Sequence, residues 1–214
     1  MSVKTRSYWE RCYGQATEKT REFFTSGHES YLAAFAKEFL PLPSRLLVLG
    51  CGGGRNVEYL LHCGYEVIGV DLALSALQLA SSKTRTCFVQ ADIRSLPLAN
   101  ESFDGLFCLH TIDHLSQSDA SIALSEILRV LKPQKNALIS FNSPDESSPS
   151  AELELMQDGT RNYKSSSCEG LIFRPYENQE IADLMGHSLV SLSETDNKSR
   201  LAHISKEPKT TLRP

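Results

Sequence analysis

The sequence predicts a doubly wound α/β fold, in which a mostly parallel sheet carries helices on both faces. Five short apolar runs follow one another between residues 45 and 141, and such runs are typical of strands buried on both faces of a parallel sheet. Segments in which apolar residues recur at helical spacing separate most of these runs. A glycine-rich stretch stands where the first run gives way to the first helical segment, which is the usual place for a ligand-binding turn in such a sheet.

The predicted strands share an apolar centre, and most of them end at a glycine, an acid or a polar residue. They are Arg45–Gly50, Tyr65–Asp71, Thr86–Gln90, Phe103–Leu109 and Asn136–Phe141. The helices predicted between them are Asn56–Cys63, Leu74–Ser81 and Ala120–Leu131. Pro133 ends the last of these helices, because proline cannot continue a helical hydrogen-bond ladder. The link Ala91–Ser102 contains Pro97, so any helix there is short.

The flanking segments add elements on both sides of this alternation. An amphipathic helix is expected over His28–Leu40, ended by Pro41 and Pro43. After the fifth strand we expect a polar loop, a short helix, a longer helix, two final strands and a frayed tail. These segments are Asn142–Ser150, Glu152–Asp158, Pro175–Met185, Ser188–Leu192, Leu201–Ile204 and Glu207–Pro214.

Length and composition indicate one soluble domain. The chain has 214 residues, of which 41% are hydrophobic and 22% are charged, as is usual for globular proteins. The formal net charge of -4 disfavours a protein held to nucleic acid or anionic lipid mainly by charge. The sequence has no apolar run near the roughly 18 residues of a membrane span, and its N-terminus shows no signal-peptide core. We therefore expect a cytoplasmic protein, monomeric or homodimeric, with no membrane partner.

Six cysteines are scattered along the chain without a Cys-x-x-Cys pair. A disulfide framework is typical of small secreted domains, so buried free thiols in a reducing compartment are the favoured interpretation. The paired ligand spacings of a zinc site are missing as well, and no metal is expected.

The glycine-rich stretch Gly50-Cys51-Gly52-Gly53-Gly54 is the sharpest local feature. Glycine allows a tight turn and lets the backbone approach a ligand without a Cβ in the way. Free N–H groups of the following helix face the same space. A glycine turn alone is weak evidence for a ligand, since it also occurs as a purely structural turn.

Two acids strengthen the interpretation as a nucleoside-binding site. Asp71 ends the second predicted strand about 20 residues after the first glycine, where a carboxylate is suited to ribose hydroxyls. Asp92 follows the third strand and can accept a hydrogen bond from an exocyclic amine such as that of adenine. The alternatives are that Asp71 caps the helix that begins near Ala73 and that Asp92 is a turn residue.

The glycine spacing excludes two common nucleotide motifs. In the dinucleotide fingerprint G-x-G-x-x-G the third glycine allows close helix packing, but that position is Arg55 here. The spacing is instead G-x-G-x-G, at Gly50, Gly52 and Gly54. No Gly-Lys-Ser/Thr follows, so the stretch is not a P-loop.

Taken in order, residues 45–141 resemble the class I S-adenosylmethionine-dependent methyltransferases. The resemblance rests on the glycine loop, Val70-Asp71-Leu72, Ala91-Asp92-Ile93, Ser102–Leu106, Leu109–Leu115 and Leu128–Pro133. It implies a Rossmann-like, mostly parallel seven-stranded sheet with a closing antiparallel strand. Cys51–Asn56 followed by Gly64–Val67 is similar to small-molecule methyltransferases of the tellurite-resistance and thiopurine types, and to methyltransferase domains 11 and 25.

The resemblance implies S-adenosyl-L-methionine as cofactor, S-adenosyl-L-homocysteine as product and in-line displacement of the methyl group by a small-molecule acceptor. The residues that match cofactor-binding positions are Gly50, Cys51, Gly52, Asn56, Asp71, Leu72, Asp92, Ile93 and Leu109. Two positions depart from the family pattern. Val48 replaces an acid that usually helps to hold the methionine end of the cofactor, which implies weaker binding or another group in that role. Gln134-Lys135 replaces a common Gly-Gly pair and concerns only a turn.

His110 and His114, with Asp113 beside them, follow the fourth predicted strand and are the candidates for a general base near the methyl group. A pKa near neutrality suits that role. The alternative for both histidines is local packing or hydrogen bonding.

Residues outside these motifs are candidates for the substrate side. Tyr8, Trp9 and Tyr13 are expected to form a lid, with ordinary packing as the alternative. Arg174 is a candidate for binding an anionic substrate, with a solvated surface position as the alternative.

The expected layout is a single domain with an N-terminal helical lid over 1–43, a cofactor-binding core over 44–142, a substrate-side insertion over 143–174 and a closing helix and hairpin over 175–206. A small molecule is the expected acceptor, and nucleic acid is disfavoured. Two other functions remain open: a non-catalytic domain that binds the cofactor and regulates a partner, favoured by Val48, and an NAD-dependent oxidoreductase, disfavoured by Arg55.

Overall fold

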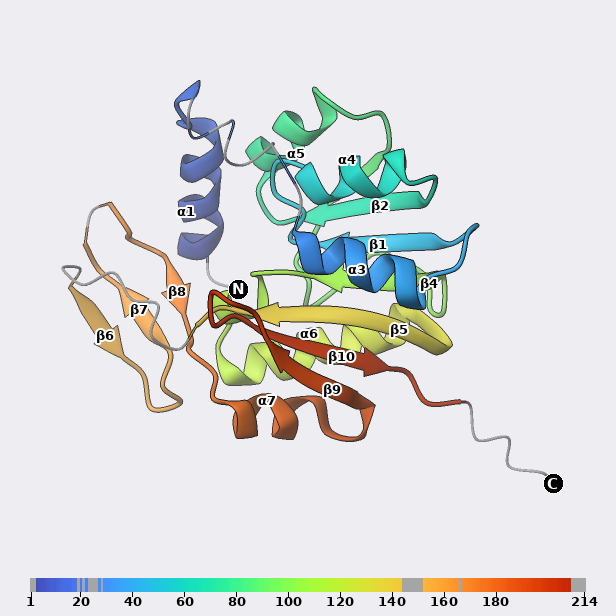
Figure 1. Cartoon of the computed structure of the whole chain (residues 1–214). Coiled ribbons are helices and arrows are strands. Elements are labelled where there is room, and N and C mark those ends of the chain that lie inside the picture. The colour runs from blue at the N-terminus through green and yellow to red at the C-terminus, as the bar shows by residue number, and fades with distance from the viewer. Residues whose placement is uncertain are drawn as a thin grey trace.

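The computed structural model describes residues 3–208 apart from 19, 21, 23–26, 28, 144–151 and 166. A seven-stranded sheet runs through it in the order β3-β2-β1-β4-β5-β10-β9 (Figure 1). All its neighbouring strands are parallel except β10, which lies antiparallel between β5 and β9. The strands are β1 (Arg45–Leu49), β2 (Glu66–Asp71), β3 (Cys87–Gln90), β4 (Phe103–Cys108), β5 (Leu131–Phe141), β9 (Leu189–Glu194) and β10 (Arg200–Ser205). The predicted doubly wound sheet with a closing antiparallel strand is confirmed.

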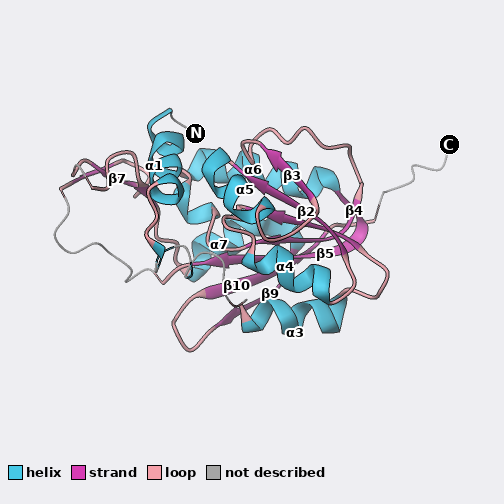
Figure 2. Cartoon of the chain, turned by 90° about the horizontal axis from the view of Figure 1, so that it is seen from above, coloured by secondary structure: helices cyan, strands magenta, loops and turns pink. Residues whose placement is uncertain are grey.

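Helices cover both faces of this sheet (Figures 1 and 2). One hydrophobic cluster joins the sheet to α3, α4 and α5, and another joins it to α6 and α7. The helices are α1 (Val3–Gly14), α3 (Ser30–Phe39), α4 (Arg55–His62), α5 (Leu74–Ser81), α6 (Gln117–Val130) and α7 (Asn178–Met185), with short 3-10 turns η1 (Ile112–His114) and η2 (Gly186–Ser188). Helix α1 packs against α5.

Strand β1 shows why the core strands appear in the sequence as continuous apolar runs. Leu46 and Val48 point into the cluster of α3 and α4, whereas Leu47 and Leu49 point into the cluster of α6 and α7. Because successive side chains of a strand alternate between faces, a strand covered on both sides needs apolar residues at every position. The ends of β1, β2 and β4 are thereby fixed side by side, and the loops that leave them share one edge.

The expected helix over Glu152–Asp158 is wrong. Residues Leu153–Leu155 form strand β6, which pairs antiparallel with β7 (Arg161–Tyr163). A turn joins the two strands, with Gly159 at φ 82°, and an Asp-Gly pair between apolar residues is a strong hairpin signal. Strand β8 (Ile172–Phe173) completes this second, three-stranded sheet.

Two further segments differ from the expectation. Strand β5 begins at Leu131, directly after α6, with an irregular register near Gln134 where φ is 59°. The link 91–102 contains no helix. Arg129 of α6 holds that link instead, because its guanidinium donates to the carbonyl oxygens of Leu96 and Leu98.

Other expectations fall partly outside the described residues. Of the polar loop Asn142–Ser150, only Asn142 and Ser143 are described, and of the tail Glu207–Pro214, only Glu207 and Pro208. None of the helices in the described residues is long and apolar enough to cross a membrane. All six cysteines are free thiols, among which Cys51 and Cys108 are buried and Cys87 is exposed.

Candidate functional site

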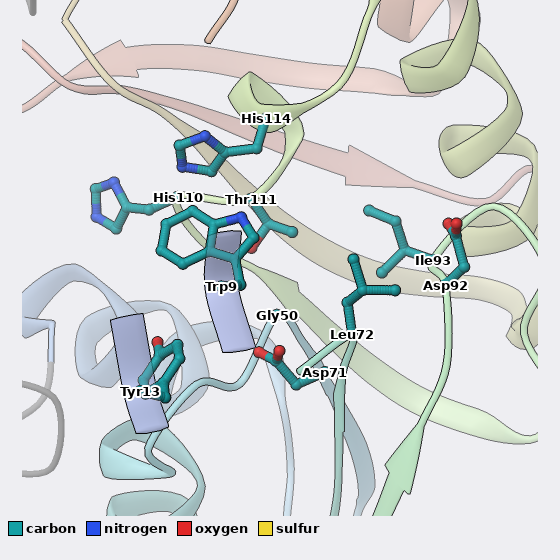
Figure 3. Close-up of a pocket in the computed structure, with 10 residues that line it drawn as sticks. All are labelled: Trp9, Tyr13, Gly50, Asp71, Leu72, Asp92, Ile93, His110, Thr111 and His114. Carbon is teal, nitrogen blue, oxygen red and sulfur yellow. The ribbon is translucent and has the colours of Figure 1, made fainter. Parts of the chain in front are cut away.

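Two adjoining cavities open at the carboxyl ends of the parallel strands. The smaller one, called here the inner cavity, measures about 80 Å³. Its walls are Trp9, Tyr13, Gly50, Asp71, Leu72, Asp92, Ile93, His110, Thr111 and His114. The outer cavity measures about 970 Å³ and shares Trp9, Tyr13, Gly50 and both histidines with the inner one. Figure 3 shows Asp71, Leu72 and Ile93 bordering one side of the inner cavity and the two histidines the other.

The glycine loop forms the floor between the two cavities. Gly50 and Gly52 both adopt left-handed conformations, with φ of 63° and 52°. A Cβ at Gly50 would stand 2.1 Å from Thr111 Oγ1, and one at Gly52 would stand 2.4 Å from Tyr13 Oη. Any side chain here would therefore be strained and would fill the space above the loop. The predicted residues Cys51, Gly52, Asn56 and Leu109 line the outer cavity.

Asp71 ends β2 and is buried against the loop. Its Oδ2 accepts a hydrogen bond from Gly52 N at 2.8 Å, and its Oδ1 accepts one from Ala73 N at 2.9 Å. Burial raises the pKa of this carboxyl, while the two N–H donors counteract that effect. A carboxylate has about four acceptor positions, so Asp71 caps the turn and keeps acceptor capacity for a ligand in the inner cavity.

Asp92 is held differently from Asp71. Its two oxygens accept hydrogen bonds from Arg94 Nε and Nη2, and Arg94 also pairs with Asp119 at 2.8 Å. Burial raises the pKa of Asp92. The carboxylate lines the inner cavity as the sequence predicts, but it shares its acceptor capacity with Arg94. The neighbouring Ile93 is 4% exposed and contributes an apolar wall.

His110 is fixed at both ring nitrogens. Its Nδ1 lies 2.5 Å from Asn142 Oδ1 and its Nε2 lies 2.8 Å from Tyr31 Oη. Because Asn142 Oδ1 only accepts, Nδ1 carries the proton and Nε2 accepts from Tyr31. The backbone of His110 is left-handed, at φ 51°, and Ser140 Oγ accepts its N–H at 2.9 Å. Asp113 is buried and does not line either cavity; its Oδ2 accepts from Asn142 N at 2.9 Å.

His114 lines both cavities and has one ring nitrogen bonded to the backbone. Its Nδ1 donates to the carbonyl oxygen of Ile172 at 2.9 Å, so the neutral ring presents an unprotonated Nε2. Burial lowers the pKa of His114, which favours that neutral form at pH 7. Its ring packs edge-on against Trp9, with 4.9 Å between ring centroids.

Helix α1 places Trp9 and Tyr13, two of the three residues predicted to form a lid, in the wall of the inner cavity; the lid itself stays a prediction. The helix is anchored by Glu10, whose carboxylate accepts from Leu74 N at 2.7 Å and from Ser75 N at 3.0 Å at the start of α5. Tyr8 lines neither cavity and packs on Trp9, with 5.0 Å between ring centroids.

Arg174 is not among the residues that line the two cavities, and its burial contradicts the alternative of a solvated surface position. The side chain is 3% exposed, pairs with Glu180 at 2.7 Å and stacks over Tyr176. Its Nε also donates to the carbonyl oxygen of Asp158 at 3.0 Å. The guanidinium is therefore satisfied inside the protein, and we do not propose it as a substrate contact.

Sequence reasoning missed most of the outer cavity. Its walls include Glu29, Ser30 and Tyr31 at the start of α3, Asn142 after β5, and Thr195, Asp196, Asn197 and Ser199 in the β9–β10 hairpin. No motif marks these residues, because they come from segments that only the folded chain brings together. In the described part of the chain, no group of three or more His, Cys, Asp or Glu side chains is arranged to hold a metal ion.

Comparison with known proteins bears directly on this site. Residues 47–139, which carry the glycine loop, Asp71 and both histidines, match a protein family described as a methyltransferase domain. Over these residues the chain is similar to the class I S-adenosylmethionine-dependent methyltransferases. S-adenosylmethionine is the cofactor of this family. The sequence motifs imply a glycine loop after the first strand and an acid at the end of the second, and the structure has both.

Named relatives place the chain among methyltransferases of diverse acceptors. It is 35% identical over 134 residues to a malonyl-[acyl-carrier protein] O-methyltransferase of Pseudescherichia vulneris, covering 62% of this chain and 53% of that protein. It is 30% identical to a ubiquinone biosynthesis O-methyltransferase of Alkalilimnicola ehrlichii, over 45% of this chain and 40% of that protein. The chain thus spans about half the length of the curated relatives it matches.

The fold of this chain is shared with solved structures. The 1,6-didemethyltoxoflavin-N1-methyltransferase of Burkholderia thailandensis, crystallised with 1,6-didemethyltoxoflavin and S-adenosylhomocysteine, superposes with a TM-score of 0.69 at 20% identity. The match covers 94% of this chain and 88% of that one. At this identity the likeness establishes the fold.

Proposed function

We propose that the protein transfers a methyl group from S-adenosylmethionine to a small-molecule acceptor. One observation carries the proposal: the folded chain brings Gly50, Asp71 and Ile93, from the ends of three strands, into one cavity that adjoins a larger one at His110 and His114. The first cavity offers the contacts that an adenosine needs, and the second offers room for an acceptor beside it.

The residues of the inner cavity fit an adenosyl group by their chemistry. Asp71 retains acceptor positions for the two ribose hydroxyls. Leu72 and Ile93 supply apolar surface for the faces of adenine. The space above Gly50 and Gly52, which a Cβ would fill, is where the chain linking ribose to the amino-acid end would pass.

The proposed acceptor is small because of the shape and charge of the outer cavity. A volume of about 970 Å³ lies within the usual range for small-molecule sites, roughly 300–1,000 Å³. Among the described residues that line it, the acids include Glu29 and Asp196, and the one arginine, Arg55, pairs with Glu29. The cavity therefore favours neutral or cationic acceptors over polyanions such as nucleic acid.

When bound, S-adenosylmethionine supplies a methyl group on a sulfonium sulfur that an acceptor nucleophile displaces. The protein mainly aligns the reactants and excludes water, which Trp9 and Tyr13 do by covering the inner cavity. For an acceptor that must lose a proton, we propose His114 as the base, since it lines both cavities and its Nδ1–H bond to Ile172 leaves Nε2 unprotonated in the neutral ring. Both nitrogens of His110 are engaged, so we propose that His110 positions the acceptor.

Calorimetric titration with S-adenosylmethionine, S-adenosylhomocysteine and NAD tests this function. We expect both adenosyl ligands to bind at one site per chain and NAD not to bind. Binding of NAD without binding of either adenosyl ligand would contradict the proposal and favour an oxidoreductase.

A second measurement separates catalysis from binding alone. S-adenosylmethionine with a radiolabelled methyl group is incubated with a panel of phenols, amines, thiols and carboxylic acids, and label transfer is counted. We expect transfer to at least one neutral or cationic member. Adenosyl-ligand binding without transfer to any acceptor of a broad panel would favour the non-catalytic regulatory function that Val48 suggests.

A further inference from the structure

The position of Val48 raises a question about the methionine end of the cofactor. Val48 is 2% exposed and packs in the cluster beneath α3 and α4. An acid there would be buried among apolar side chains at considerable cost. The α-ammonium of the cofactor therefore needs a carboxylate from another part of the chain.

Glu29 places a carboxylate at the glycine loop from outside the strand motifs. It precedes α3 and lines the outer cavity together with Gly52, Gly53 and Arg55. Its carboxylate pairs with the guanidinium of Arg55, the first residue of α4. The two side chains are 22% and 27% exposed, so the pair is partly shielded and open on one side to the cavity.

Local bonding shows that this placement is not helix capping. Glu29 occupies the N-cap position of α3, yet its side chain makes no capping hydrogen bond to that helix. Its backbone N–H instead donates to Asn56 Oδ1 at 3.2 Å. Asn56, predicted as a cofactor residue, thus ties residue 29 to the start of α4, and the carboxylate extends over the loop toward Arg55.

We propose that Glu29 binds the α-ammonium of S-adenosylmethionine and that Arg55 binds its α-carboxylate. The inference rests on the proposed function and names two residues for one end of its cofactor. A zwitterionic amino-acid head presents a positive and a negative group a few ångströms apart, and an adjacent acid–arginine pair presents their complements. Charge-assisted hydrogen bonds of this kind are about twice as strong as neutral ones, and the planar guanidinium suits a carboxylate. Glu29 thereby takes the role for which Val48 is unsuited.

The chemistry of three ligands separates the two contacts. S-adenosylhomocysteine carries both charged groups, the amine S-adenosyl-3-thiopropylamine lacks the carboxylate, and 5′-methylthioadenosine lacks both. All three keep the adenosine and the thioether, so we expect each to make the same contacts in the inner cavity. Calorimetric titration of each into the unchanged protein, Glu29→Gln and Arg55→Gln gives the comparison.

Glu29→Gln should lower the affinity for S-adenosylhomocysteine and for the amine by about tenfold or more, which corresponds to a loss of roughly 1.4 kcal/mol of binding free energy. Its affinity for 5′-methylthioadenosine should stay within about twofold of that of the unchanged protein. Arg55→Gln should lower the affinity for S-adenosylhomocysteine far more than the affinity for the amine. Glu29→Asp should recover part of the lost affinity, because it keeps the charge.

Glu66→Gln is the matched control. It breaks another glutamate–arginine pair, with Arg45 at 2.8 Å, at the opposite ends of β1 and β2. It should leave the affinities for all three ligands unchanged. Thermal unfolding of every variant confirms that it is folded at the titration temperature.

Unchanged affinity of Glu29→Gln for S-adenosylhomocysteine would overturn the inference while leaving the proposed function standing. An equal loss for all three ligands would overturn it too, because Glu29 would then act on the adenosine end. Failure of the unchanged protein to bind S-adenosylhomocysteine and 5′-methylthioadenosine would overturn both the inference and the proposed function.

Discussion

The inner and outer cavities meet at the same histidines but are built in different ways. The inner cavity takes much of its wall from strand ends and the loops that follow them, so parallel pairing of β1 with β2 and β4 sets the spacing of its residues. The outer cavity shares the glycine loop and the segment after β4, but takes the rest of its wall from α1, the start of α3, the segment after β5 and the β9–β10 hairpin. Side-chain bonds such as Tyr31–His110 and His110–Asn142 join those parts. The difference teaches that the proposed adenosine site depends on the sheet, whereas the proposed sites for the acceptor and for the amino-acid end of the cofactor also depend on contacts between distant segments.

The largest expected effect is on the free energy of unfolding, and it distinguishes a residue that stabilises the fold from one that binds a ligand. Arg174→Ala should lower the free energy of unfolding by about 2–3 kcal/mol, because it leaves buried acceptors unpaired and removes packing on Tyr176. Affinity for S-adenosylhomocysteine should not change. Denaturant unfolding and calorimetry measure the two quantities.

The control for Arg174 is Lys164→Ala, which breaks an exposed ion pair with Glu154 at 2.7 Å. Such exposed pairs contribute little to stability, because water and salt screen them. Weaker ligand binding by a well-folded Arg174→Ala protein would show that this arginine does reach the site.

Asp71→Ala tests the inner cavity directly. It should weaken S-adenosylhomocysteine binding at least about tenfold, since the ribose hydroxyls lose a charged acceptor. The variant also leaves Gly52 N and Ala73 N without their partner, so its folding must be checked by thermal unfolding. Unchanged affinity in a folded variant would mean that the ribose contact lies elsewhere.

Gly50→Ala measures how closely the loop must fit its surroundings. Both Gly50 and Gly159 have positive φ, but a Cβ at Gly159 meets nothing within 4 Å whereas one at Gly50 meets Thr111. Each substitution should cost about 1 kcal/mol of stability from backbone strain. Only Gly50→Ala should also lower the affinity for S-adenosylhomocysteine, by about fivefold. Equal affinities in the two variants would show that space above Gly50 does not matter for the cofactor.

The smallest effect concerns the pH dependence of His114. Burial lowers its pKa in the folded protein below the ordinary value of 6.5, so below that pH the unfolded chain binds a proton that the folded chain does not. Its contribution to stability is therefore fully present above about pH 6.5 and is lost as the pH falls from there through the lower pKa of the folded protein. The thermal unfolding midpoint should fall less from neutral pH to about pH 5 in His114→Gln than in the unchanged protein.

His62→Gln serves as the reference for this comparison, since His62 is exposed at the end of α4. It should reproduce the pH dependence of the unchanged protein. Identical pH profiles for all three proteins would contradict the burial effect at His114.

The contrast between the cavities also explains how far the sequence could be interpreted. The core strands and the helices α4, α5 and α7 follow from local periodicity, because each needs apolar residues only where it meets the sheet. Gly50 and Asp71 were predictable for a related reason, since their positions relative to strand ends place them in one cavity. The short helix expected at Glu152 failed because the turn at Gly159 pairs two strands there instead.

The acceptor side could not be predicted from local signals. Glu29 and Tyr31 reach the site only because α3 packs across the sheet. The burial of Arg174 depends in part on the carbonyl oxygen of Asp158, which lies in the turn between β6 and β7 and accepts from its Nε. Tertiary contacts of this kind leave no periodic trace in one sequence.

A crystal structure with S-adenosylhomocysteine bound is the most direct test of the division between the two cavities. We predict adenine between Leu72 and Ile93, the ribose hydroxyls on Asp71, and the amino-acid end in the outer cavity beside Glu29 and Arg55. The sulfur should lie at the junction, facing His110 and His114. A ligand bound outside these cavities, or with adenine in the outer one, would contradict the account.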